Sequence, residues 1–139
     1  MKSPSSPVKQ KPQGLILSLI ISIGGYFATF IIFAVTYTFN RVIVNDVDIS
    51  KEDPAKDTIK IIMLVVGLVF PFISGYYFGR KNTDIKTNAH YLLCVATGLY
   101  VFYLAEGQFH IAFVALFSFL AMLIVMGGFK LATKKRIAP

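Results

Sequence analysis

Apolar and charged positions along this chain fall into long blocks rather than short periods. Four stretches contain no Lys, Arg, Asp or Glu: residues 12–40, 61–79, 87–105 and 107–129, with lengths of 29, 19, 19 and 23 residues. A helix needs about 20 mostly apolar residues to cross the hydrocarbon core of a bilayer, because each residue rises about 1.5 Å along the helix axis. The pattern therefore predicts a polytopic membrane protein with four helical spans.

The same blocks predict how the chain is organised. We expect an all-α integral membrane protein, in which residues 14–132 form a four-helix transmembrane bundle. The turn at 105–108 is so short that the third and fourth spans must form a tight antiparallel hairpin. Residues 1–13 are rich in Ser, Pro and Lys and are expected to form a disordered basic tail, while residues 133–139 form a second basic tail. The four spans are expected at about 14–40, 58–79, 88–105 and 108–132.

Composition agrees with a bilayer environment. Apolar residues make up 55% of the chain and charged residues only 15%, whereas a soluble domain carries about 25% charged residues. The net charge of +7 does not indicate a nucleic-acid partner, because the basic residues lie at the ends of the predicted spans and not on one folded surface. The lipid bilayer is therefore the first predicted partner, and no nucleic acid is expected.

The distribution of basic residues predicts the orientation of the chain. The N-terminal tail, the second connection and the C-terminal tail together carry ten Lys and Arg residues, and the opposite side carries four. Six of the seven acidic residues lie on the side with four. Basic residues near the ends of spans are retained on the cytoplasmic side. We therefore expect a multi-pass protein of the plasma membrane, in the first instance a bacterial inner membrane, with both termini cytoplasmic.

Small and polar residues recur along one face of each predicted span. Lipid tails are as apolar as the side chains that face them, so helices associate in a bilayer through close approach at small residues and through interhelical hydrogen bonds. These stripes predict packing faces between helices, and the alternative is that they line a polar pathway or a groove for a lipid-like ligand. They comprise Ser18, Ser22, Gly25 and Thr29 in the first span, Gly67, Pro71 and Ser74 in the second, and Gly98 in the third.

Pro71 predicts one irregularity within the second span. A proline has no N–H, so Pro71 cannot donate to the carbonyl of Gly67, and its ring crowds that carbonyl. The helix is therefore expected to bend between these two residues.

The sequence holds few residues that could carry chemistry. No metalloprotease motif, paired intramembrane aspartates or Gly-rich phosphate loop is present, so we predict no enzymatic activity, no cofactor and no metal centre. His90 and Cys94 have a spacing that suits a metal, but no further cysteine completes a site. Glu106 and His110, four residues apart, form a candidate cation-binding or pH-sensing pair on the outer face. The simpler interpretation is a carboxylate beside an imidazole at the start of a helix.

These observations favour a small non-catalytic membrane protein that acts through protein contacts in the bilayer. It would be an accessory, assembly, immunity-like or regulatory subunit whose partner is another membrane protein or a second copy of itself. One alternative is an oligomeric small channel, transporter or holin-like protein. A third hypothesis is a membrane-embedded lipid-binding or lipid-modifying protein.

Overall fold

The computed structural model describes residues 11–44, 54–82, 88–107 and 109–137. All the regular structure in these ranges is helical, which confirms the prediction of an all-helical protein. The expected tail at 1–13 lies almost entirely outside the described residues. At the other end of the chain, the last helix continues through Ile137, so residues 133–137 of the predicted basic tail are helical.

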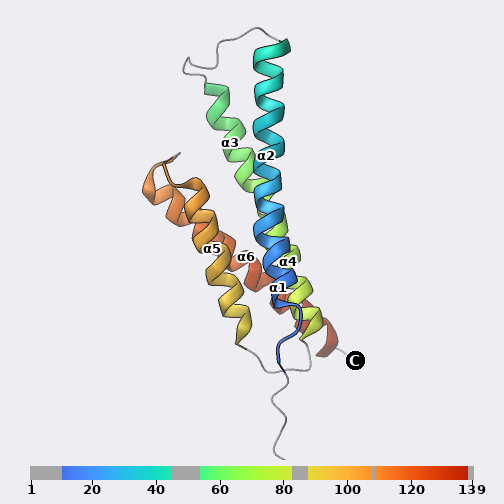
Figure 1. Cartoon of the computed structure of the whole chain (residues 1–139). Coiled ribbons are helices and arrows are strands. Elements are labelled where there is room, and N and C mark those ends of the chain that lie inside the picture. Colours follow the sequence, from blue (N-terminus) through green and yellow to red (C-terminus); the bar gives the residue numbers. More distant parts are fainter. Residues whose placement is uncertain (1–10, 45–53, 83–87, 108, 138–139) are drawn as a thin grey trace, which may run out of the picture.

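The first helical rod is built from four consecutive segments. These are α1 (Leu15–Leu19), the π-helical η1 (Ile20–Gly24), α2 (Gly25–Thr38) and the π-helical η2 (Phe39–Val44). They follow one another without a break (Figure 1) and span about 45 Å at about 1.5 Å per residue. Gly14 precedes the rod with a φ of 74°, a left-handed conformation that glycine adopts without steric cost.

The second rod is interrupted where the sequence predicts a bend. It comprises α3 (Pro54–Gly67) and α4 (Val69–Lys81), with Leu68 between them outside either helix. The N–H of Leu68 donates to the carbonyl of Val65 at 3.2 Å, which tightens the chain locally. Because Pro71 offers no N–H to the carbonyl of Gly67, the regular helical ladder fails at this point. The predicted irregularity is therefore confirmed.

The last two helices lie side by side and are joined by a short turn. They are α5 (Ala89–Ala105) and α6 (Ile111–Ile137), and Gly107 in the turn has a φ of 77°. Within the described residues, three helical stretches are long and apolar enough to cross a membrane: Leu15–Arg41, Thr58–Lys81 and Ile111–Lys134. The remaining helix, α5, is apolar but has only 17 residues.

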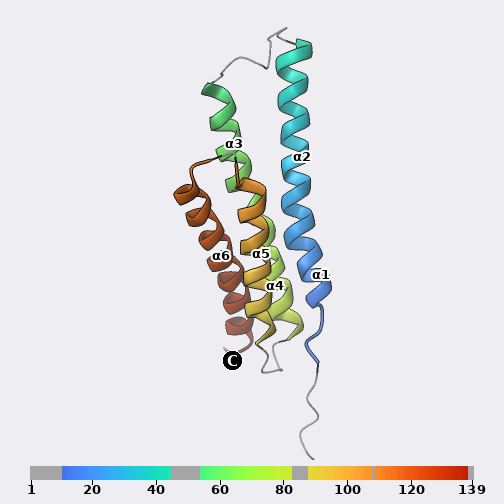
Figure 2. The same ribbon diagram turned by 60° about the vertical axis from the view of Figure 1, so that its left-hand side comes forward.

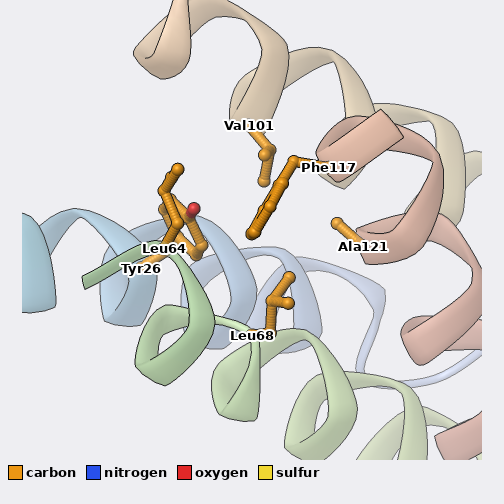
Figure 3. Close-up of a cluster of buried hydrophobic side chains, with 6 residues drawn as sticks. All are labelled: Tyr26, Leu64, Leu68, Val101, Phe117 and Ala121. Carbon is orange, nitrogen blue, oxygen red and sulfur yellow. The ribbon is translucent and has the colours of Figure 1, made fainter. Parts of the chain in front are cut away.

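The helices pack unequally along the length of the molecule. At the N-terminal end, where Leu15 lies, the first rod packs with α4 and α5, and these two helices pack against α6 (Figures 1 and 2). At the opposite end, α2 and α3 project together beyond the turn between α5 and α6; we call this the hairpin end. A buried cluster lies between the two regions and draws one or two residues from each rod and from α5 and α6 (Figure 3). Its members are Tyr26, Leu64, Leu68, Val101, Phe117 and Ala121.

Candidate functional site: helix interfaces and the hairpin-end groove

Glycines of α4 and α6 allow a close contact between these two helices. A side-chain carbon added to Gly75 would meet the carbonyl oxygen of Val125, and one added to Gly128 would meet the carbonyl oxygen of Phe72. A carbon added to Gly79 would lie 2.8 Å from the carbonyl oxygen of Phe129. These are backbone atoms, so the two helix backbones touch each other directly. This is the close approach that small residues allow between helices in a bilayer.

The buried hydroxyl groups of the predicted stripes bridge different helices. The hydroxyls of Ser22 and Thr97 lie 2.9 Å apart and connect η1 to α5. The Ser74 hydroxyl donates to the carbonyl of Ser18 at 2.5 Å and connects α4 to α1. The first, second and third predicted spans therefore present their polar stripes to one another.

The fourth helix joins the same network through Ser118. Its hydroxyl donates to the carbonyl of Gly98 at 2.5 Å, so α6 is tied to α5. Gly98 also has Met122 directly against it. This hydroxyl and the three described above are buried at helix contacts, where they satisfy one another or the backbone.

The remaining stripe residues also lie at packed positions. Gly25 has the ring of Phe70 against it, and Gly67 has the ring of Tyr26, 2.6 Å from the position of an added side-chain carbon. The hydroxyl of Thr29 donates within its own helix, to the carbonyl of Gly25 at 3.0 Å. Pro71 is fully buried. The structure thus brings the stripe residues together in the interior of the bundle.

A buried asparagine, which sequence analysis does not identify, connects the start of the first rod to the end of the second. Asn82 follows α4 and is only 1% exposed. Its side-chain oxygen accepts from the N–H of Gln13 at 2.8 Å, and its amide nitrogen donates to the carbonyl of Gln13 at 2.7 Å. The same nitrogen donates to the carbonyl of Phe78 at 2.9 Å. Asn82 thus pairs with a backbone segment as a neighbouring strand would.

Two buried hydroxyls have no hydrogen-bond partner among the described residues, those of Ser18 and Tyr26. Tyr26 is only 3% exposed and belongs to the central buried cluster (Figure 3). A space of about 10 Å³ adjoins Tyr26, and its other lining residues are apolar except for Lys60. That volume matches about one water molecule.

The predicted pair Glu106 and His110 does not share a helix. Because α5 ends at Ala105 and α6 begins at Ile111, both residues belong to the turn, and the i, i+4 geometry of a helix does not apply to them. Both side chains are exposed, and no hydrogen bond or ion pair joins these two described residues. The His110 Nδ1 accepts from the N–H of Ala112 at 3.4 Å.

The other two candidate metal ligands, His90 and Cys94, are packed among aromatic and apolar side chains. His90 is buried, with its ring stacked on Phe129 at a centroid distance of 4.3 Å and an interplanar angle of 6°. Cys94 is buried among apolar side chains near it. Within the described part of the chain, no group of three or more His, Cys, Asp or Glu residues is arranged to hold a metal ion.

A groove lies at the hairpin end, between α2 and η2 on one side and α3 on the other. Its volume is about 310 Å³. Of the described side chains, the first side supplies hydroxyl, phenol, amide and guanidinium groups, and the α3 side supplies two isoleucines. The guanidinium carbon of Arg41 lies 5.8 Å from the centroid of the Tyr37 ring, in a cation–π contact. The lining residues are Phe33, Thr36, Tyr37, Asn40, Arg41, Ile59 and Ile62.

Comparison with known proteins gives no assignment: no protein family, no curated protein and no solved structure matches the chain.

Proposed function

We propose that the chain is a four-span protein of the bacterial inner membrane with both termini in the cytoplasm. The three long apolar helices support the membrane assignment. As the fourth span we propose α5, because it runs antiparallel to α6 and because 17 residues reach the lower limit for crossing a bilayer. Lys81, Lys130 and Lys134 all lie toward the N-terminal end of the bundle, which supports a cytoplasmic location for that end.

Within that membrane we assign the protein a non-catalytic role exercised through protein contacts, as an accessory, assembly, immunity-like or regulatory subunit. One observation carries this proposal: α2 and α3 project past the α5–α6 turn with no other described helix beside them, while the small and polar groups of the rest of the bundle are used in internal contacts. The face of α2 turned away from α3 is exposed, with Val35 at 63%. A second membrane protein, or a second copy of this chain, would supply helices that pack against α2 and α3 at the hairpin end.

The internal hydrogen bonds favour this role over conduction through a single copy. A polar pathway needs hydroxyl groups that face an open channel, whereas those of Ser22, Ser74 and Ser118 bond to other helices. A channel or a holin-like pore would therefore have to form between copies. Proteoliposomes containing the purified protein test that alternative directly, since ion flux above that of empty vesicles would favour it.

Site-specific photocrosslinking in native membranes tests the proposed role. A photoreactive amino acid at position 35 of α2 should give a discrete adduct, because this position would face the partner. The matched control is position 99 of α5, since Leu99 is equally exposed at 62% but lies away from the hairpin end. The mass of the adduct distinguishes a second copy from another protein. Absence of an adduct at position 35, or the same adduct at both positions, would contradict the proposal.

A further inference from the structure

We propose that the groove at the hairpin end binds one phospholipid from the surrounding leaflet, with the lipid phosphate at Arg41 and Asn40 and the upper part of an acyl chain against Ile59 and Ile62. This inference requires that the chain lies in a membrane. It does not require a protein partner, so it stands or falls separately from the role proposed above.

The size and the two-sided chemistry of the groove favour an amphiphile. Its volume of about 310 Å³ falls at the lower end of the range for small-molecule sites, which suits a head group and the first part of a chain. Among the side chains that the structure describes, one wall carries Asn40 and Arg41, and the facing wall carries Ile59 and Ile62. A fully polar ligand would leave the isoleucines against polar atoms, whereas an amphiphile can place its polar part and its apolar part against matching walls.

The position of the groove along the first rod places it at the level of lipid head groups. Residues 12–40 carry no charge, and Arg41 is the first charged residue after them. Arginine side chains at the ends of spans reach toward the head-group region, where phosphate is the anion present at highest density. The groove therefore opens where phosphates of the leaflet are available.

The chemistry of Arg41 selects a phosphate. A guanidinium carries five N–H donors in a planar fork that matches two phosphate oxygens, so it can bind a phosphate alongside its other contacts. Its contact with the Tyr37 ring holds the fork beside the groove. Asn40, one residue earlier, brings an amide that can donate to the same phosphate.

Thr36 adds a preference among head groups. Its hydroxyl already donates to the carbonyl of Ile32 at 2.8 Å, so it offers the groove only acceptor lone pairs. A head group with a hydroxyl donor, such as phosphatidylglycerol, can use that acceptor, whereas the quaternary ammonium of phosphatidylcholine cannot. Phosphatidylglycerol also carries the net negative charge that Arg41 favours.

Native mass spectrometry of the purified protein tests the site. Detergent micelles would be supplied with equal amounts of phosphatidylglycerol and phosphatidylcholine, and the lipid-bound fraction would be compared for wild type, Arg41→Gln and Arg41→Lys. Loss of a charge-assisted phosphate contact should weaken phosphatidylglycerol binding about tenfold or more in Arg41→Gln. Arg41→Lys should fall between, because a lysine keeps the charge but not the fork.

The matched control is Lys60→Gln, which removes the first cation of the second span without altering the groove. The Lys60 Nζ lies 5.9 Å from the centroid of the Phe109 ring, and Lys60 does not line the groove. This variant should retain phosphatidylglycerol as wild type does. Equal retention in Arg41→Gln and wild type would overturn the proposal, as would an equal loss in Arg41→Gln and Lys60→Gln. Competition by millimolar inorganic phosphate would overturn the lipid assignment and leave a site for free anions.

Discussion

Neighbouring glycines in α6 allow the packing of this bundle to be tested with a single added methyl group. Gly127 and Gly128 lie in the same helix, yet nothing lies within 4 Å of a side-chain carbon added to Gly127. A carbon added to Gly128 would collide with the carbonyl oxygen of Phe72 and lie 2.9 Å from the nitrogen of Tyr76. Because both atoms belong to the backbone of α4, no side-chain rotation can relieve the collision, and the two helices must separate.

The two substitutions should therefore change stability in opposite directions. Replacing glycine by alanine within a helix gains about 1 kcal/mol of intrinsic stability, and Gly127→Ala should gain most of that amount. Gly128→Ala makes the same gain but loses about 1–3 kcal/mol or more to overpacking. We expect the upper end of that range because the obstacle is backbone. The two variants should differ by about 3 kcal/mol in the free energy of unfolding, or roughly a hundredfold in the unfolding equilibrium.

Titration with SDS in mixed micelles, followed by circular dichroism at 222 nm, measures this difference. Wild type, Gly127→Ala and Gly128→Ala would be compared at the same protein and lipid concentrations, with Gly75→Ala as a second variant on the facing helix. Gly75→Ala should behave as Gly128→Ala does, because its added carbon would meet the carbonyl of Val125. If Gly128→Ala proved as stable as Gly127→Ala, the helices α4 and α6 could not be in backbone contact, and the packing described above would be refuted.

Three further predictions use the same unfolding assay. Tyr26→Phe removes a buried hydroxyl that has no partner and should leave the protein equally stable or up to about 2 kcal/mol more stable; a loss above 1 kcal/mol would mean that water or another group satisfies the hydroxyl. A double-mutant cycle of Ser22→Ala and Thr97→Val should give a coupling energy of about 0.6 kcal/mol and no more than about 1.7 kcal/mol, and a value of zero would contradict the hydrogen bond between them. Asn82→Leu should lower stability by about 1–3 kcal/mol because it leaves buried backbone groups unsatisfied, whereas the exposed Asn88→Leu should have no comparable effect.

The helical segments could be predicted because charge-free length and proline chemistry are local properties of the sequence. The three long apolar helices lie where the uncharged stretches predict them, and the helix breaks before Pro71 as expected. The stripe positions Ser18, Ser22 and Ser74 were identified from their spacing alone. Which stripe faces which depends on the order in which helices neighbour one another, and spacing within one helix carries no information about that order.

Other features depend on geometry between segments and could not be predicted. An uncharged stretch predicts the length of a helix but not its position along the bundle axis relative to the neighbouring helices. The projection of α2 and α3 beyond the α5–α6 turn could therefore not be predicted. Glu106 and His110 are paired by their spacing of four residues, and spacing alone does not show that both lie in the turn between α5 and α6. Asn82 follows two basic residues at the end of an apolar stretch, where an asparagine ordinarily marks a helix boundary exposed to water.

The pairing of Asn82 with Gln13 sets an order of events during synthesis. These residues are 69 positions apart, and a ribosome adds about 5–20 residues per second. About 3–14 s therefore pass between the synthesis of Gln13 and that of Asn82. During this interval the backbone groups of Gln13 must form hydrogen bonds with water. The first rod can enter the membrane before Asn82 is synthesised. Its N-terminal end can form hydrogen bonds with Asn82 only after the second rod has also entered. In a chain whose synthesis is stalled before position 82, the N-terminal end of the first rod lacks its contact with Asn82. A protease added at that stage should cut near residue 13.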